Sequence, residues 1–556
     1  MASIQIDATT CALGLLAVVL VVVGLRLRSP PPLAHPFVLG RQSIAARTRK
    51  QGQSPVYTTS SLGGVRPPQR PDKRVRTLAN IVQDSATCFE RAQRGTFLPT
   101  TYVTNSHKLK DIVEQLRVGL GNALGSQPVN VALLVQDPTD TLLLTLALAL
   151  SPHDVVVISP DSNIPSQGFE PAQVIIHSSD RTTEADNVPR SISATKLISI
   201  GTPEQPSAEA QEWIETGKTI IADGKASAVP EQQPADVALT MVSEGIALKL
   251  THLNLTSALV AWGSMFPASS GSTKPTIKDT AMTLHHPATP YGFGLSLYLI
   301  YCSSSIDLPT LPPKATHDEM FQLLDVPPLI SLLFAPVEPT SELLYKLFLT
   351  NMLGDFANII RYGRDAKQKL LRQGVLRNDT FWDKILFNGV RKDSRAIKLR
   401  FLALEGQSEQ ARLESFRTIL GQPVVSTKSH AFLLSPLTSG MMFDLQRLPR
   451  PGTDEADLRE TAHVGAPVAG IEIKIMGKED DIERGRVRGE LLVRSPLLPS
   501  PSTIPSPLLL EDDELPQLPP YPGVASTDTD GAKWLRTGIK GEIAPEGVLW
   551  LEDEDD

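Results

Sequence analysis

One stretch in the middle of the chain, from Asp236 to Leu255, combines residue types that can bind phosphate. It reads DVALTMVSEGIALKLTHLNL and contains several hydroxyl side chains. A loop that wraps a phosphate needs glycines, which let backbone N–H groups approach the oxygens, together with hydroxyls or a lysine that stabilise the charge. In this stretch Gly245 is the only glycine and Lys249 the only lysine. Lys249 lies in the strand-like run ALKL, which favours an outward-facing side chain.

The other residues that could do chemistry form no recognisable catalytic or metal-binding motif. His285 and His286 are adjacent, but such a pair is more often structural or on the surface than catalytic. The three cysteines, Cys11, Cys88 and Cys302, are too few and too scattered for a disulfide framework or a zinc site, which fits a reducing compartment. These residues alone therefore predict no catalytic residue and no metal site.

The composition is that of a globular protein with more than one domain. A chain of 556 residues exceeds what one core usually holds, and 41% of its residues are hydrophobic and 21% charged. The net charge of -8 argues against a nucleic-acid partner, because phosphate binding needs clustered Lys and Arg over the folded domain.

An apolar run without a charge lies near the N-terminus, from Cys11 to Leu25. With its flanking residues it reaches roughly the shortest length that spans a bilayer. A signal peptide is the rival interpretation, but Asp7 precedes the run and Arg26 and Arg28 follow it, the reverse of a signal peptide's charges. We therefore predict an N-terminal transmembrane helix, an anchor over residues 1–28, with the body in the cytosol. The run's modest length favours the endoplasmic reticulum, with peroxisome and lipid droplet as alternatives.

A basic, proline-rich segment follows and is predicted to be a linker over residues 29–77. Between Arg26 and Arg76 there are eleven Lys or Arg and one acid, Asp72. Such a segment can lie against anionic headgroups, or it can be a solvated spacer, which its prolines favour equally.

Further along, helical and strand patterns alternate. Strand-like runs at 129–135, 154–159, 172–177 and 196–200 are separated by helical spacing, which predicts parallel βαβ sheets. We expect an α/β fold over 78–462. A smaller β-rich subdomain with antiparallel strands should follow over 463–551, with a proline-rich insertion at 496–523 and an acidic tail at 552–556.

Two C-terminal stretches carry a family resemblance. HVGAPVAGIEIKIMG followed by RGELLVRSP resembles the pattern vGxPxpgxexki followed by GEllvrGp, and KWLRTGIKGEIAPEGVLWL resembles WlxTGDiGeidedGyl. Both patterns belong to the AMP-forming acyl-CoA synthetase and adenylating-enzyme superfamily. The segments THLNL, PYGFGLSLYLIY and LRFLALEGQ come before them in the family's order, and HPFVLGRQS is similar to divergent fungal members. The resemblance covers roughly residues 78–551 and implies an adenylating-enzyme-type N-terminal domain.

The resemblance also implies a reaction and its site. In that family ATP and a carboxylic acid give an acyl-adenylate and pyrophosphate, and a thiol such as CoA then takes the acyl group. An active member would need ATP and Mg²⁺ and would use a fatty acid and CoA. The implied nucleotide side comprises the turn at 426–432 and Thr240, Ser243, Gly245, Thr251, Gly406, Thr537 and Gly538. The implied acyl pocket comprises Tyr291, Phe293, Leu295 and Leu297, although ordinary core packing is the favoured explanation of these residues.

Several family positions are altered. The phosphate loop TSGTTGxPKG falls on residues 238–247, ALTMVSEGIA, with Ile246 at the lysine position. Ile539 replaces the aspartate that holds the ribose, Thr289 replaces a histidine, and no YGxTE follows GQPVV. Family members continue into a small domain with a catalytic lysine, whereas this sequence ends soon after Leu551, so we expect neither that lid nor its lysine.

Three functional hypotheses follow. The first is a membrane protein that resembles a long-chain acyl-CoA synthetase and has weakened or lost ligase activity. The second is an active, divergent acyl-CoA or acyl-adenylate ligase. The third is a membrane scaffold that binds partners through its basic, proline-rich and acidic segments and takes no small-molecule ligand.

Overall fold

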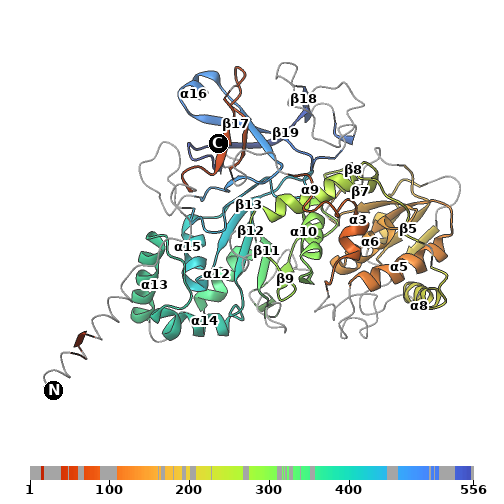
Figure 1. Cartoon of the computed structure of the whole chain (residues 1–556), viewed down its shortest axis with the longest axis horizontal. Coiled ribbons are helices and arrows are strands. Elements are labelled where there is room, and N and C mark those ends of the chain that lie inside the picture. Colours follow the sequence, from red (N-terminus) through yellow and green to blue (C-terminus); the bar gives the residue numbers. More distant parts are fainter. Residues whose placement is uncertain are drawn as a thin grey trace, which may run out of the picture.

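The protein was studied as a computed structural model. The structure describes residues 39–47, 49–60, 68–87, 109–160, 162–164, 170–178, 181–190, 196–200, 208–226, 228–266, 274–309, 330–338, 340–350, 357–446, 461–499, 503–505, 508–511 and 533–552, with isolated residues at 14, 16–17, 316, 318–319, 322 and 324. Three β-sheets organise these residues, and helices cover and separate them (Figure 1).

The first sheet has six strands in the order β6-β5-β3-β4-β7-β8. Its strands are β3 (Asn130–Leu134), β4 (Asp154–Ile158), β5 (Val174–His177), β6 (Lys196–Ser199), β7 (Val237–Ser243) and β8 (Ile246–Thr251). All neighbours are parallel except β7 and β8, which form an antiparallel hairpin. The helices of this part are α5 (Leu109–Leu124), α6 (Pro138–Ala149), α7 (Thr182–Ala185) and α8 (Ala208–Ala222). The predicted strand and helix alternation is thus confirmed.

The second sheet has seven strands in the order β10-β9-β11-β12-β13-β14-β15. Its strands are β9 (Thr280–Thr283), β10 (Ser305–Asp307), β11 (Leu332–Pro336), β12 (Phe401–Glu405), β13 (Val424–Lys428), β14 (Thr438–Ser439) and β15 (Ala466–Pro467). The first five of these in sheet order are parallel. Its helices are α12 (Thr340–Thr350), α13 (Ala357–Arg372), the π-helix η2 (Asp383–Phe387), α14 (Asn388–Asp393) and α15 (Gln410–Leu420).

The third sheet is antiparallel and forms the predicted β-rich part. Its strands are β1 (Ser43–Ala45), β2 (Tyr57–Thr59), β16 (Glu472–Met476), β17 (Val487–Arg494), β18 (Leu509–Glu511), β19 (Lys533–Ile543) and β20 (Leu549–Leu551), and the short helix α16 (Glu479–Glu483) lies between β16 and β17. Here the structure differs from the predicted linker, because β1 and β2 belong to this sheet. Buried Asp444 also accepts a 2.7 Å hydrogen bond from Gln42, which holds the segment to the body.

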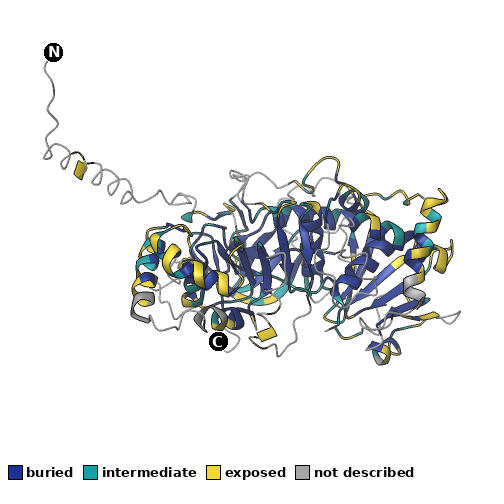
Figure 2. Ribbon diagram, turned by 90° about the horizontal axis from the view of Figure 1, so that it is seen from below, coloured by how far each residue is buried: buried dark blue, intermediate teal, exposed yellow. Residues whose placement is uncertain are grey.

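The largest core cluster joins the three sheets. Helices α9 (His252–Gly263) and α10 (Pro290–Tyr301) lie in the middle of the molecule, next to α3 (Leu78–Gln83), between the first and second sheets (Figure 1). Every residue of α10 from Pro290 to Ile300 is buried, so this helix is core on all sides. Buried residues fill the middle of the molecule, whereas exposed ones lie mainly at its two ends (Figure 2). Side chains from all three sheets share the same apolar cluster.

The predicted transmembrane helix lies almost entirely outside the described residues, which include only Gly14, Leu16 and Ala17 of the apolar run. Within the described part of the chain, none of the helices has the length and apolar character needed to cross a bilayer. The acidic tail is outside the described residues except for Glu552, and most of the proline-rich insertion is outside them as well.

Candidate functional site

The second sheet has a switch point between β9 and β11. From β9 the chain moves outward to β10 on one side, then returns to build β11, β12 and β13 on the other. In open parallel sheets, ligands bind outside the carboxyl ends of the strands at such a point. The topology therefore predicts a ligand site at the carboxyl ends of β9, β12 and β13.

At these strand ends lies a polar cluster, which we call the strand-end cluster. His285 follows β9, Tyr291 is on α10, Glu405 is the last residue of β12, Thr427 is near the end of β13 and Ser429 follows it. The Tyr291 hydroxyl lies 3.2 Å from the Thr427 hydroxyl, and Ser429 donates a 2.6 Å hydrogen bond to the Glu405 carboxylate. The rings of His285 and Tyr291 are in edge contact, with centroids 4.6 Å apart. Carboxylate, imidazole and hydroxyl groups from four segments thus lie at this edge of the sheet.

Burial sets the protonation of this cluster. It lowers the pKa of His285 to about 4, although the nearby Glu405 carboxylate acts in the opposite direction. Burial also raises the pKa of Tyr291 far above its ordinary value. At neutral pH the imidazole and the phenol are therefore both uncharged. The buried His285 Nε2 has no hydrogen-bond partner among the residues that the structure describes.

The stretch 236–255 is a hairpin and a helix cap. Strands β7 and β8 are joined by Glu244 and Gly245 alone, and both have positive φ, 51° and 74°, the pattern of a two-residue type I′ turn. Thr240 is buried within β7, opposite Lys249, and Lys249 is exposed as expected. Between the two strands there is no loop that could wrap a phosphate.

Thr251, at the end of β8, has a structural role. It is the N-cap of α9, where its backbone N–H donates to the Asn254 side chain over 2.7 Å and its hydroxyl accepts from the Asn254 N–H over 3.3 Å. Asn254 in turn donates to the carbonyls of Pro496 and Leu498. The Thr-His-x-Asn-Leu motif is thus a capping box that ties the helix to the third sheet's side of the molecule.

Three predicted nucleotide-side segments do meet in space, but through apolar contacts. Leu248 of β8, Phe432 of the 426–432 turn and Leu535 of β19 share one buried cluster. Thr537 and Gly538 form a bulge in β19 opposite Leu491, where the Thr537 hydroxyl donates to the Leu491 carbonyl over 2.8 Å. A bulge re-aims side chains and is common beside functional sites.

Two further predicted residues are placed as follows. Gly406 directly follows β12, has a φ of 124°, and donates its N–H to the Thr427 carbonyl over 2.8 Å, so it lies beside the strand-end cluster. Ser243 is partly exposed at the hairpin turn. The described residues include no group of three His, Cys, Asp or Glu arranged for a metal ion.

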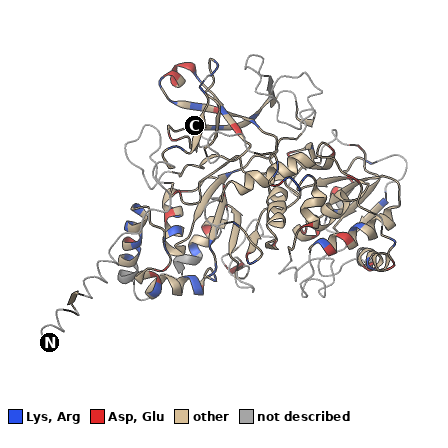
Figure 3. Ribbon diagram, in the orientation of Figure 1, with Lys and Arg blue, Asp and Glu red and all other residues tan. Residues whose placement is uncertain are grey.

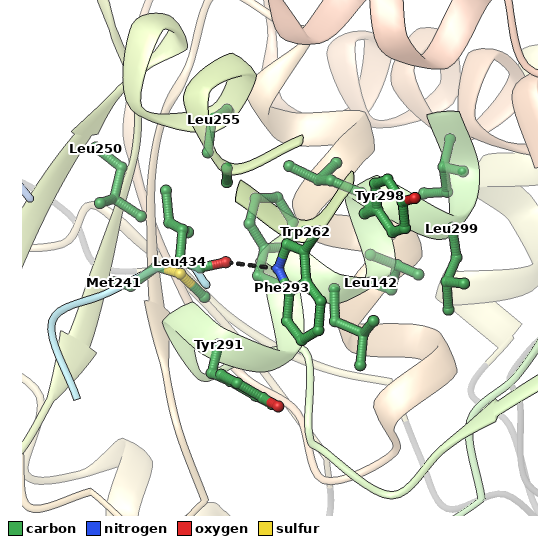
Figure 4. Packing of buried hydrophobic residues seen from close by; sticks show 14 of the residues in the cluster. Leu142, Met241, Leu250, Leu255, Trp262, Tyr291, Phe293, Tyr298, Leu299 and Leu434 are labelled. Atoms are coloured by element: carbon green, nitrogen blue, oxygen red, sulfur yellow. Dashed lines mark hydrogen bonds between the residues drawn. The ribbon is translucent and has the colours of Figure 1, made fainter. Parts of the chain in front are cut away.

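The predicted acyl-pocket residues lie together on α10, where they are part of the main core cluster. Phe293, Leu295 and Leu297 are completely buried, and Tyr291 packs edge-on against Trp262 with ring centroids 5.0 Å apart. The Trp262 indole donates a 2.9 Å hydrogen bond to the Leu434 carbonyl, which fixes this packing (Figure 4). The acyl pocket itself stays a prediction.

The fold matches solved acyl-CoA and aryl-CoA ligases. A long-chain-fatty-acid–CoA ligase from Archaeoglobus fulgidus superposes with a TM-score of 0.57 at 14% identity, over 88% of this chain and 86% of that one. An anthranilate CoA ligase in complex with anthranoyl-AMP gives 0.54 at 13% identity, over 86% and 78% of the two chains. The N-terminal domain of FACL13 from Mycobacterium tuberculosis gives 0.51 at 16% identity, over 86% and 97%.

The chain has the acyl-CoA ligase fold. The predicted adenylating-enzyme architecture is thereby confirmed. No known protein-family profile matches this sequence. Long-chain-fatty-acid–CoA ligase 6 of rat and of human is 24% identical over 196 residues, 35% of this chain. The match spans only 24% of the length of these curated relatives.

The acyl-CoA ligase fold implies a site for the triphosphate of ATP, but the residues present do not fit one. The two-residue turn at Glu244 and Gly245 leaves too few backbone N–H groups to surround it. At the position that the sequence resemblance assigns to the ribose contact, Ile539 packs against the main core cluster, and an apolar side chain accepts no hydrogen bond. For Mg²⁺, the strand-end cluster offers a single carboxylate, that of Glu405, which accepts a hydrogen bond from Ser429.

The sequence did not single out Glu405, and it favoured a structural or surface role for His285. His285 lies two residues after β9 and Glu405 is the last residue of β12. A position at the carboxyl end of a parallel strand is therefore the feature that could have marked both residues. Without the strand order, the sequence alone did not show that β9, β12 and β13 bring them together.

Proposed function

We propose that this chain is a membrane-associated protein with the acyl-CoA ligase fold whose ATP-dependent ligase activity is weakened or lost. The observation that carries the proposal is the two-residue turn between β7 and β8. A tight I′ turn pairs its flanking strands to the very end, as Ser243 and Ile246 are paired here. It therefore has no free backbone to close over a phosphate.

The energetic consequence is large. Each charged or bidentate contact to the reacting phosphates supplies a few kcal/mol of transition-state stabilisation, or about 10²- to 10³-fold in rate. The turn lacks the loop's donors and its lysine, and Ile539 cannot hold a ribose hydroxyl. Losses of this kind compound, so turnover should fall by many orders of magnitude.

Membrane association rests on the sequence. The apolar run from Cys11 to Leu25 and the basic residues after it support an anchor with a cytosolic body, most simply in the endoplasmic reticulum, with peroxisome and lipid droplet as the alternatives.

The second candidate is an active, divergent ligase that uses ATP, Mg²⁺, a fatty acid and CoA. It is favoured by the strand-end cluster, because polar groups with an unpartnered His285 Nε2 are gathered at the switch point where ligands bind. In this reading Glu405 and His285 would replace contacts that other ligases make elsewhere.

The test is nucleotide binding and exchange by the full chain in detergent micelles. ATP binding is measured by calorimetry with Mg²⁺, beside fatty-acid-dependent exchange between ATP and pyrophosphate. An established long-chain ligase in the same micelles is the positive control. We expect no exchange and no binding at millimolar nucleotide from a folded sample.

The opposite outcome has its own control. If exchange occurs, Glu405→Gln should abolish it under the second candidate, whereas Lys249→Ala, at an exposed strand position, should leave it unchanged. Exchange with that pattern would overturn the proposed loss of activity and place the chemistry at the strand-end cluster.

A further inference from the structure

An exposed aromatic face stands out on the helices beside the second sheet. Tyr362 on α13 is 69% exposed, and Phe381 and Ile385, one helical turn apart around the start of η2, are 67% and 54% exposed. The rings of Tyr362 and Phe381 both pack edge-on against Trp382, with centroid distances of 5.5 Å and 5.4 Å. We call Tyr362, Phe381, Trp382 and Ile385 the aromatic face.

Basic residues are frequent on the segments that carry this face. In the sequence, Lys384 lies between Phe381 and Ile385, and Arg361 directly precedes Tyr362. From residue 361 to residue 398, nine Lys or Arg are exposed against three Asp, and they gather on the same end of the molecule (Figure 3). The basic residues are Arg361, Arg364, Lys369, Arg372, Arg377, Lys384, Lys392, Arg395 and Lys398, and the acids are Asp365, Asp379 and Asp393.

A buried ion cluster holds the aromatic face in place. Asp383, at the start of η2, is completely buried and accepts from Lys367 of α13 over 2.6 Å and from Arg391 of α14 over 2.9 Å. Thr380 donates to its other oxygen through both its N–H and its hydroxyl. The turn that carries Phe381, Trp382 and Ile385 is thus fixed to two helices. π-Helical turns of this kind are frequent at functional sites.

A glycine allows the close approach of α13. A Cβ on Gly363 would lie 2.7 Å from a Leu386 methyl and 2.9 Å from the Trp382 ring. The absence of a side chain there lets Tyr362 and Trp382 meet, so the aromatic face is built by packing and not by chance exposure.

We propose that the aromatic face and its basic rim dock on an anionic membrane surface. Tyr, Trp and Phe favour the headgroup level, where a ring is in contact with both apolar and polar surroundings, and Lys and Arg beside them pair with anionic lipids. The excess of positive charge matches the cytoplasmic leaflet. This inference is independent of ligase activity and of the N-terminal apolar run.

A protein partner fits the same surface less well. Protein interfaces are depleted of Lys and buried charge at their centres, whereas the exposed Lys384 lies in the sequence between Phe381 and Ile385, two exposed apolar residues of the aromatic face. Lys384 can extend to a phosphate while its stem stays with Phe381 and Ile385. A second copy of the chain would also place the two basic rims against each other.

Tryptophan fluorescence offers a direct test in the full chain. The protein has five tryptophans, and Trp213, Trp262, Trp534 and Trp550 are buried while Trp382 is partly exposed. The apolar run contains no tryptophan. Quenching by brominated acyl chains therefore reports on Trp382 even when the run anchors the protein in the bilayer.

The experiment uses the full chain reconstituted into vesicles of brominated phosphatidylcholine with or without phosphatidylserine. We expect quenching of the tryptophan fluorescence with phosphatidylserine, and less quenching without it or at high salt. The quenching that depends on phosphatidylserine should be absent in Trp382→Phe. The exposed double variant Lys384→Glu with Ile385→Ser should also lose it. Its matched control is Lys278→Glu with Ile277→Ser, the same changes at an exposed pair elsewhere.

Two results would overturn the proposal. One is quenching by wild-type protein that equals that of the Lys384 and Ile385 double variant. The other is a dimer in detergent, seen by sedimentation, that this double variant dissociates and the matched control does not. The second result would assign the aromatic face to self-association.

Discussion

At the scale of single residues, the molecule buries charge where it fixes a turn. Asp383 and its partners Lys367 and Arg391 have side-chain exposures of only 0%, 4% and 5%. Burial lowers the pKa of Lys367 to about 8, while hydrogen bonding to Asp383 opposes that shift. One carboxylate thus compensates two buried cations, and its loss should be costly.

We predict that Asp383→Asn lowers the free energy of unfolding by about 3–5 kcal/mol, because it leaves two buried cations without a counter-charge. The control is Asp379→Asn, whose pair with Arg377 is exposed on both sides and should change stability by less than about 1 kcal/mol. Urea unfolding at pH 7 measures both. Equal effects of the two substitutions would contradict the role given to the buried cluster.

At the scale of elements, two helices approach each other through glycine. A Cβ on Gly119 of α5 would lie 1.8 Å from the Trp213 carbonyl oxygen of α8, and one on Gly217 of α8 would lie 2.0 Å from the Gln115 carbonyl oxygen. The backbones of α5 and α8 are therefore in direct contact. Gly121, two residues further along α5, has open space around it.

This difference gives a matched pair within one helix. Gly119→Ala should lower the free energy of unfolding by about 1–3 kcal/mol, since the helices must move apart. Gly121→Ala should raise it by up to about 1 kcal/mol, because alanine favours the helical backbone. Thermal or urea unfolding compares the two, and a stabilised Gly119→Ala would rule out the close contact of α5 and α8.

At the scale of the whole molecule, histidines are buried neutral at several junctions. Burial lowers the pKa values of His252, His285 and His430 to about 4 each. His252 accepts a hydrogen bond from the Leu78 N–H at its Nδ1, joining α9 to α3. Asp137 has the opposite effect on the pH dependence of stability, because burial raises its pKa to about 7 and the native state therefore holds its proton more tightly than the unfolded chain does.

The sign of the pH dependence follows. At these histidines the native state binds fewer protons than the unfolded chain between pH 4 and pH 6.5, so the stability that they contribute is complete above about pH 6.5 and is lost as pH falls toward 4. For His252 the difference is up to about 3 kcal/mol. We predict that urea midpoints fall between pH 7 and pH 5, and that His252→Gln makes this fall shallower. An unchanged slope in the variant would contradict a neutral, buried His252.

Elements that are specified by neighbouring residues could be predicted from the sequence, whereas elements that depend on distant partners could not. The runs VNVALLV and DVVVIS predicted β3 and β4 because β-branched residues with apolar periodicity specify strands within a few residues. The segment 29–77 was predicted to be a linker because it is rich in basic residues and prolines. Its strands β1 and β2 have only three residues each, too few to give a strand pattern in the sequence. β1 pairs with β2, and the partner that joins this pair to the sheet, Ile473 opposite Tyr57, lies more than 400 residues away.

The α/β class, the antiparallel C-terminal strands and the absence of a glycine-rich phosphate loop could all be predicted from the amino-acid sequence, because each is a property of contiguous residues. The fold was needed to show that a two-residue turn stands in place of that loop and that Thr251 caps a helix. It alone brought His285, Tyr291, Glu405 and Thr427 to one sheet edge, and Lys367 to Asp383. The physical reason is that strand order and helix packing are set by burial across the whole chain, which no local pattern encodes.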